Sequence, residues 1–193
     1  MAELESGSRP KGGIDASQRG IPSIGAENIN GLGKYSYNKE KYVSYEFYQR
    51  MNRGHVKSGD VLLYKDGAHI GKKALFRDGF PHKVCCINEH VFILRSNARV
   101  TQSYLYFWLD QPHMTTNIRN LNANAAQPGI NQGGVNGLPL LIPAKAVLNA
   151  WEAIAEPLLA ELFNLAKKNN NLRQTRDHLL PKLISGEVDV VEL

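Results

Sequence analysis

The most regular pattern of hydrophobic and polar positions lies in the last third of the chain. Hydrophobic residues alternate there at spacings of four and three, which is the a/d spacing of a coiled coil. The pattern predicts a helix from about residue 145 to residue 180, about 54 Å long at about 1.5 Å per residue. The positions that we assign to its seam are Trp151, Ala155, Leu158, Leu162, Leu165, Asn169, Leu172, Arg176 and Leu179.

A helix of this length cannot bury the whole stripe within a small domain, so we expect it to pair with a second helix. Asn169 and Arg176 support this expectation, because polar groups on a seam set register and partner number. The alternative is that the helix packs back on the rest of the chain. Pro157 removes a helical hydrogen bond and clashes with the carbonyl of Ala153. We therefore expect a kink there, or a helix that begins near Glu156.

Shorter patterns upstream predict a compact mixed domain. Short β-rich segments favour strands near 21–24 and residue 29, within 59–68, and near 73–76, 83–87 and 90–95, with 138–142 as a closing strand. Capping residues and helical periodicity favour helices at 45–51, 101–110 and 112–121. We expect an α+β fold: a mostly antiparallel, β-rich domain with short helices over residues 1–143. A coiled-coil helix and a short tail follow over residues 144–193.

Charge is distributed unevenly between these two parts. Up to Pro143 the chain has 17 basic and 11 acidic residues, and from Ala144 onward it has 6 basic and 7 acidic residues. A basic domain favours a polyanionic partner, most often nucleic acid. The alternative for the basic residues of the glycine-rich start and of the strand ends is a solvated surface. The candidate DNA-binding residues among them, with Lys65 also a candidate base contact, are Arg9, Lys11, Arg19, Lys65, Lys72 and Lys73.

An amide-rich segment before the helix provides candidate base contacts. Asn124, Gln127, Asn131 and Gln132 lie among glycines and a proline. A side-chain amide offers a donor and an acceptor together, which matches adenine in the major groove. The alternative is a turn-rich loop, in which asparagine is common for conformational reasons.

The sequence contains no recognisable catalytic set. Its histidines show no metal-ligand spacing with acidic residues, and it has neither a nucleophile elbow nor a cofactor fingerprint. We therefore expect no catalytic residue, metal or cofactor.

Cys85 and Cys86 are adjacent, which favours buried strand residues over a disulfide and fits a cytoplasmic protein. No apolar segment reaches membrane-spanning length, and the start carries no apolar signal segment.

Several segments taken in order resemble the specificity (S) subunits of type I restriction-modification enzymes. Each segment is weak alone, but their order and spacing are fairly specific and cover nearly the whole chain. They are Gly7–Gly12, Ile24–Ile29, Gly59–Gly67, Asn88–Ile93, Asn124–Gln132, Leu138–Pro143 and Arg176–Glu187.

The resemblance implies a target-recognition domain that binds double-stranded DNA and a conserved helix that pairs antiparallel with a second one. In that family, methyltransferase (M) subunits use S-adenosylmethionine and an ATP-driven restriction (R) subunit cleaves DNA. The S subunit itself is not catalytic. A full S subunit has two domains and two helices, so this chain resembles a natural or excised half. A half would form a homodimer through its C-terminal helix and bind a palindromic, interrupted site.

Two other classes of function remain open from the sequence. One is a protein-interaction adaptor, whose coiled coil binds a partner and whose basic domain has no role with nucleic acid. The other is a nuclease or methyltransferase in its own right. DNA binding separates the first from a specificity subunit, and incubation of DNA with magnesium or S-adenosylmethionine tests the second.

Overall fold

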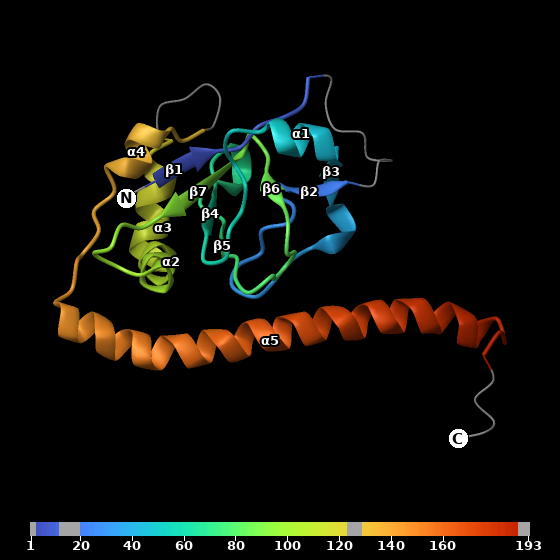
Figure 1. Cartoon of the computed structure of the whole chain (residues 1–193). Helices are drawn as coiled ribbons and strands as arrows, with labels where there is room; N and C mark the ends of the chain where they lie inside the picture. The colour runs from blue at the N-terminus through green and yellow to red at the C-terminus, as the bar shows by residue number, and fades with distance from the viewer. Residues whose placement is uncertain (1–2, 12–19, 123–128, 189–193) are drawn as a thin grey trace.

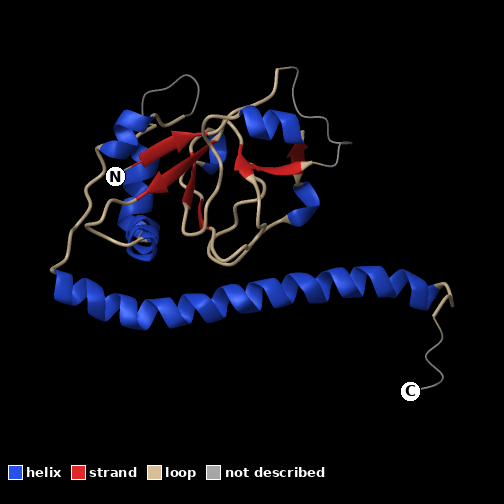
Figure 2. Cartoon of the chain, in the orientation of Figure 1, coloured by secondary structure: helices blue, strands red, loops and turns tan. Residues whose placement is uncertain are grey.

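The computed structural model describes residues 3–11, 20–122 and 129–188. A head of two small sheets and short helices lies along one long C-terminal helix (Figure 1). Strands and short helices are mixed in the head, and the long helix follows them in the chain (Figure 2). The predicted α+β class is therefore confirmed.

A four-stranded antiparallel sheet forms the centre of the head. Its strand order is β1-β7-β4-β5. The strands are β1 (Glu3–Ser6), β4 (Val61–Tyr64), β5 (Lys73–Leu75) and β7 (Val91–Arg95). The central strands β4 and β7 pair Leu62 with Ile93 and Leu63 with Phe92, and all four side chains are buried. Because both faces of these strands are buried, their sequences are short apolar runs in which apolar and polar residues do not alternate.

A second, three-stranded sheet has the order β3-β2-β6. It contains β2 (Ile21–Ile24), β3 (Lys41–Val43) and β6 (Cys86–Ile87). β2 is antiparallel to β3 and parallel to β6. The strand predicted for 83–87 is thus reduced to its last two residues. Cys85 and Cys86 are both buried, as predicted.

The closing strand predicted for 138–142 is wrong. Leu138–Ile142 lies outside any strand. Side chains of α2 (Gln102–Asp110) bind its carbonyls instead: Trp108 Nε1 donates to Pro139 O at 2.9 Å, and Tyr104 OH donates to Leu141 O at 3.0 Å. Pro139 has no N–H to give to a sheet, which disfavours a ladder in this segment.

The predicted short helices are present, with their expected caps. The Ser44 side chain caps α1 (Tyr45–Arg50) by accepting from Phe47 N, and Thr101 caps α2 by accepting from Tyr104 N. A proline begins α3 (Pro112–Asn120), where its missing N–H has no cost. The amide-rich segment contains an additional short helix, α4 (Gln132–Asn136). Two 3₁₀ turns, η1 (Tyr37–Lys39) and η2 (Gly67–His69), complete the head.

The long helix α5 (Lys145–Ile184) is continuous through Pro157. The alternative of a helix that starts near Glu156 is therefore wrong. Ala153, whose carbonyl loses its partner, and Pro157 are both exposed, so water can bind that carbonyl. No helix among the residues that the structure describes is long and apolar enough to cross a membrane.

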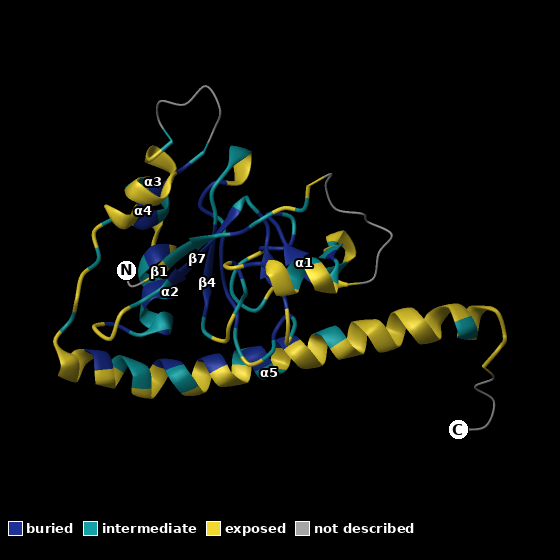
Figure 3. Ribbon diagram, turned by 45° about the horizontal axis from the view of Figure 1, so that its top comes forward, coloured by how far each residue is buried: buried dark blue, intermediate teal, exposed yellow. Residues whose placement is uncertain are grey.

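The first half of α5 packs on the head, and the second half runs on beyond it (Figure 3). Leu159, Phe163 and Ala166 belong to the same hydrophobic core as the four-stranded sheet. Leu148 and Ala155 are buried on the same face of the helix. Residues 171–181 are all exposed. The alternative that the helix packs back on the head thus holds for its first half.

Candidate nucleic-acid interface

Several charged side chains gather at the end of the four-stranded sheet that points away from α5. Lys65 directly follows β4, and Lys72 directly precedes its antiparallel neighbour β5, so both lie at this end. The opposite end of the hairpin formed by β4 and β5 contacts α5, where Arg77 Nη2 lies 2.7 Å from Glu156 Oε2. Lys65 and Lys72 are both partly exposed. The sheet therefore carries two cations on a surface that the long helix leaves open.

The amide-rich segment is anchored beside Lys65. Ile130 N donates to Lys65 O at 2.9 Å, and Gly129 forms a bridge with Asp66. Gly129 N also donates to Asn122 Oδ1 at 2.6 Å. A Cβ at Gly129 would lie 2.9 Å from Asp66 Oδ1, so glycine permits this close approach. The described residues on either side of 123–128, Asn122 and Gly129, are thus held next to the β4–β5 hairpin.

Acidic side chains already neutralise part of this charge. Lys65 Nζ lies 3.0 Å from Asp66 Oδ2, and His90 Nδ1 lies 2.7 Å from the same oxygen. Arg9 Nη1 lies 3.4 Å from Glu89 Oε1. Exposed ion pairs of this kind contribute little stability, about 0–1 kcal/mol, so a phosphate oxygen can displace one partner. We call the group Arg9, Lys65, Asp66, Lys72, Glu89, His90 and Asn122 the recognition face.

Lys73 is not part of this face, which corrects the prediction from the sequence. Its residue is 5% exposed. The ammonium donates to Gly71 O at 2.9 Å and to Thr115 Oγ1 at 3.0 Å, and lies 3.4 Å from Asp110 Oδ1. Burial lowers the pKa of this lysine. Its side chain joins β5 to α2 and α3 and cannot reach a phosphate.

The amides of the predicted set have different positions. Asn131 caps α4, because its Oδ1 accepts from Gly134 N at 2.8 Å, so one of its base-reading atoms is already occupied. Gln132 is exposed, and its Nε2 donates to Leu4 O at 3.3 Å. Lys11 is exposed as well. Arg19, Asn124 and Gln127 lie outside the described residues.

Reasoning from the sequence missed the pairing of Asp66 with His90. The available signal was their position: one follows β4 and the other precedes β7 in chain order, so antiparallel pairing places both at one end of the sheet. Burial, together with the nearby carboxylates Asp66, Glu27 and Glu89, raises the pKa of the Tyr64 phenol, so this side chain stays a neutral donor.

The predicted coiled-coil seam divides between two environments. Ala155 is buried, and Trp151 and Leu162 are partly buried, against the head, where the centroid of the Trp151 ring lies 5.3 Å from that of the Phe107 ring. The remaining seam positions are exposed: Leu158, Leu165, Asn169, Leu172, Arg176 and Leu179. Only this second group is available for a partner helix.

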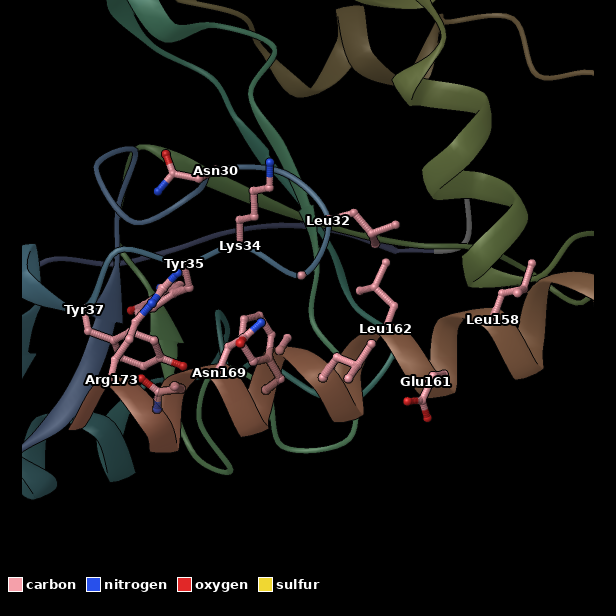
Figure 4. Close-up of a pocket in the computed structure, with 15 residues that line it drawn as sticks. Asn30, Leu32, Lys34, Tyr35, Tyr37, Leu158, Glu161, Leu162, Asn169 and Arg173 are labelled. Carbon is pink, nitrogen blue, oxygen red and sulfur yellow. The ribbon is translucent and has the colours of Figure 1, made fainter. Parts of the chain in front are cut away.

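A groove of about 730 Å³ lies where the loop over residues 30–37 meets α5. Tyr37 and Lys34 line its head side, and Leu158, Glu161 and Asn169 line its helix side (Figure 4). Arg173 reaches toward Tyr37 from the next turn of the helix (Figure 4). The groove is thus continuous with the exposed part of the helix.

Comparison with known proteins points to one family. No family model matches the chain. It is 25% identical over 113 residues to the specificity subunit of the type I restriction enzyme MjaIX from Methanocaldococcus jannaschii. It is 26% identical over 102 residues to that of HindI from Haemophilus influenzae. These matches cover 58% and 52% of this chain, and 26% and 22% of the two relatives.

Solved structures show the same fold. The type I S subunit from M. genitalium has a TM-score of 0.57 at 15% identity, over 94% of this chain and 42% of that one. The HsdS subunit from Thermoanaerobacter tengcongensis has a TM-score of 0.52 at 16% identity, over 96% and 43%. The chain is therefore homologous to the specificity subunits of type I restriction-modification systems, and it spans less than half of their length.

Proposed function

We propose that this chain recognises double-stranded DNA as half of a specificity subunit in a type I restriction-modification complex. The observation that carries the proposal is the homology to two specificity subunits over more than half of this chain. The recognition face adds a physical basis, because it collects cations, carboxylates and an amide at one open end of the sheet. In this proposal the chain performs no chemistry, and M and R subunits provide methylation and cleavage in the cytoplasm.

The recognition face would divide its contacts between phosphates and bases. Arg9, Lys65 and Lys72 would hold phosphates, which fix position without reading sequence. Asp66 can accept a hydrogen bond from cytosine N4, and the Asn122 amide offers a donor and an acceptor. Carboxylates on the face also repel phosphates, so this surface would favour selectivity over tight non-specific binding.

Residues 1–143 would form the recognition domain and residues 144–193 the helical part that joins two copies and docks M. Because Leu159 and Phe163 complete the core of the head, we treat the two parts as one folding unit. Charge supports an antiparallel homodimer. Residues 145–164 contain one basic and three acidic residues, and residues 165–184 contain five basic and one acidic. Antiparallel pairing therefore places opposite charges alongside each other.

The test is the salt dependence of binding to random-sequence duplex DNA. The logarithm of the association constant should fall linearly with the logarithm of salt concentration, by roughly 0.9 per phosphate contact. Three contacts thus predict a slope of about −2.7. An absence of binding at low salt, with M present, would favour an adaptor. The ion pairs Lys65–Asp66 and Arg9–Glu89 support the adaptor alternative, because they occupy cations that would otherwise bind phosphate.

A further inference from the structure

The helix α5 carries a second apolar face that the head does not cover. Its members are exposed, Leu158 and Leu172 by 67% each. At about 100° of rotation per residue, the residues of this second face all fall within an arc of about 60° around the helix axis, next to the face that packs on the head. We call this face the outer stripe; its members are Val147, Ile154, Leu158, Glu161, Leu165, Leu172, Arg176, Leu179 and Leu183.

The outer stripe is symmetric in sequence about a point between Lys168 and Asn169. Leu165 and Leu172 are equally far from that point, and so are Leu158 and Leu179. Ile154 and Leu183 form a third such pair. A two-fold axis through this point would therefore place leucine or isoleucine opposite leucine at every one of these positions.

The charged members of the stripe follow the same symmetry. Glu161 and Arg176 are equally far from the point between Lys168 and Asn169. Two antiparallel copies would bring each Glu161 opposite the other copy's Arg176 and form two ion pairs at the edges of the apolar contact. Parallel copies in register would instead oppose Glu161 to Glu161 and Arg176 to Arg176, which is repulsive.

We propose that a second copy of this chain binds the outer stripe antiparallel, with the two-fold axis between Lys168 and Asn169. The proposal rests on the homodimer proposed above and specifies its register. The paired segment from Ile154 to Leu183 is about 44 Å long at about 1.5 Å per residue, which is long enough for a stable helix pair. The partner helix would lie beside the groove lined by Lys34 and Tyr37, so the head forms one wall of the contact.

This register changes the predicted seam in a specific way. Trp151, Ala155 and Leu162 leave the seam because the head covers them, and Ile154, Glu161 and Leu183 join it. Asn169 stays near the axis, where its amide can meet the same amide of the second copy. A polar pair at that point would fix the register, because any shift would bury it against leucine.

Cysteine cross-linking of the full chain tests the register directly. Asn169→Cys should give a disulfide-linked dimer under mild oxidation, because the two residues lie together at the axis. Leu158→Cys alone should not, because its copies are separated by 21 residues, about 31 Å along the helix. Leu158→Cys combined with Leu179→Cys should cross-link again. Gln174→Cys, exposed on the opposite face, measures random collision, and the buried Cys85 and Cys86 of the unchanged chain give the background.

Each outcome decides the proposal. Rapid cross-linking of Leu158→Cys alone would show parallel helices and overturn it. Rates no higher than that of Gln174→Cys for all variants would show that another partner, or none, covers the stripe. DNA binding measured on the same samples separates the two proposals, since a wrong register leaves salt-dependent DNA binding by the head intact.

Charge reversal provides a second, independent test by sedimentation equilibrium. Glu161→Arg alone and Arg176→Glu alone each create two like-charge contacts in the antiparallel dimer, and should each weaken dimerisation on the order of tenfold. The double variant restores both pairs and should dimerise as the unchanged chain does. Equal weakening in the double variant would contradict the register, since no opposite-charge contact would then have been restored.

Discussion

Lys65 and Lys73 show how burial separates two residues that look alike in the sequence. Both lie at one end of the same hairpin, but Lys65 is partly exposed and Lys73 is 5% exposed. A basic residue at a strand end predicts a surface cation, and for Lys65 this holds. For Lys73 the outcome depends on Thr115 and Asp110, which α2 and α3 bring over the strand. A linear pattern does not contain that information.

The two lysines should therefore respond differently to substitution. Lys65→Ala should leave the free energy of unfolding nearly unchanged and reduce the salt slope of DNA binding by about one. Lys73→Met should leave the slope unchanged and lower stability by about 1–3 kcal/mol, because two buried hydrogen bonds are lost. Urea unfolding and DNA titration at several salt concentrations check both. An unchanged stability for Lys73→Met would mean that the ammonium is not held as the structure shows.

At the scale of elements, periodicity predicted α5 but not which of its faces meets the head. The alternation of four and three selects one stripe, whereas the helix has two adjacent apolar faces. Phe163 and Leu159 lie on the face that completes the head's core, and Leu158 lies on the other. Both faces contain leucines at helical spacing, so only the three-dimensional packing distinguishes them. The helix also continues through Pro157, where Ala153, the residue whose carbonyl loses its helical partner, is exposed to solvent.

Substitutions on the two faces should have separable effects. Phe163→Ala should lower the free energy of unfolding by about 3–5 kcal/mol, because Phe163 is fully buried. Leu158→Ala should change monomer stability by no more than about 0.5 kcal/mol, since it removes exposed surface. Urea unfolding at low protein concentration measures both effects. A large loss for Leu158→Ala under those conditions would indicate that the stripe packs within one chain.

Acid should weaken the contact between α5 and the hairpin. Arg77, 2.7 Å away, holds the pKa of Glu156 below its ordinary value of 4.5. Because the folded pKa is lowered, the folded state binds this proton less readily than the unfolded state. The stabilising contribution is complete above pH 4.5 and is lost as pH falls through the folded pKa.

Glu156→Gln should therefore be less stable than the unchanged chain at pH 7, with a difference that shrinks in acid. Urea unfolding of both proteins between about pH 7 and pH 3 measures this difference. A difference that is constant across the range would show that the ion pair is not the source.

For the whole molecule, the resemblance in the sequence predicted a head followed by a helix, and the fold confirms this order. Composition indicated the basic head, but the carboxylates that lie among its cations became visible only when the strand ends met. Asp66 and Glu89 are 23 residues apart in the chain and share His90 as a neighbour. Which side chains touch bases depends on loop conformation, which neither amide content nor charge determines.

The central claim is that two copies, joined through α5, present two recognition faces to one DNA duplex. Selection of bound duplexes from a random-sequence pool, with the M subunit present, tests it most directly. The account predicts enrichment of two inverted copies of one short sequence, separated by a spacer of constant length. Enrichment of a single uninterrupted site, or no enrichment over the starting pool, would contradict it.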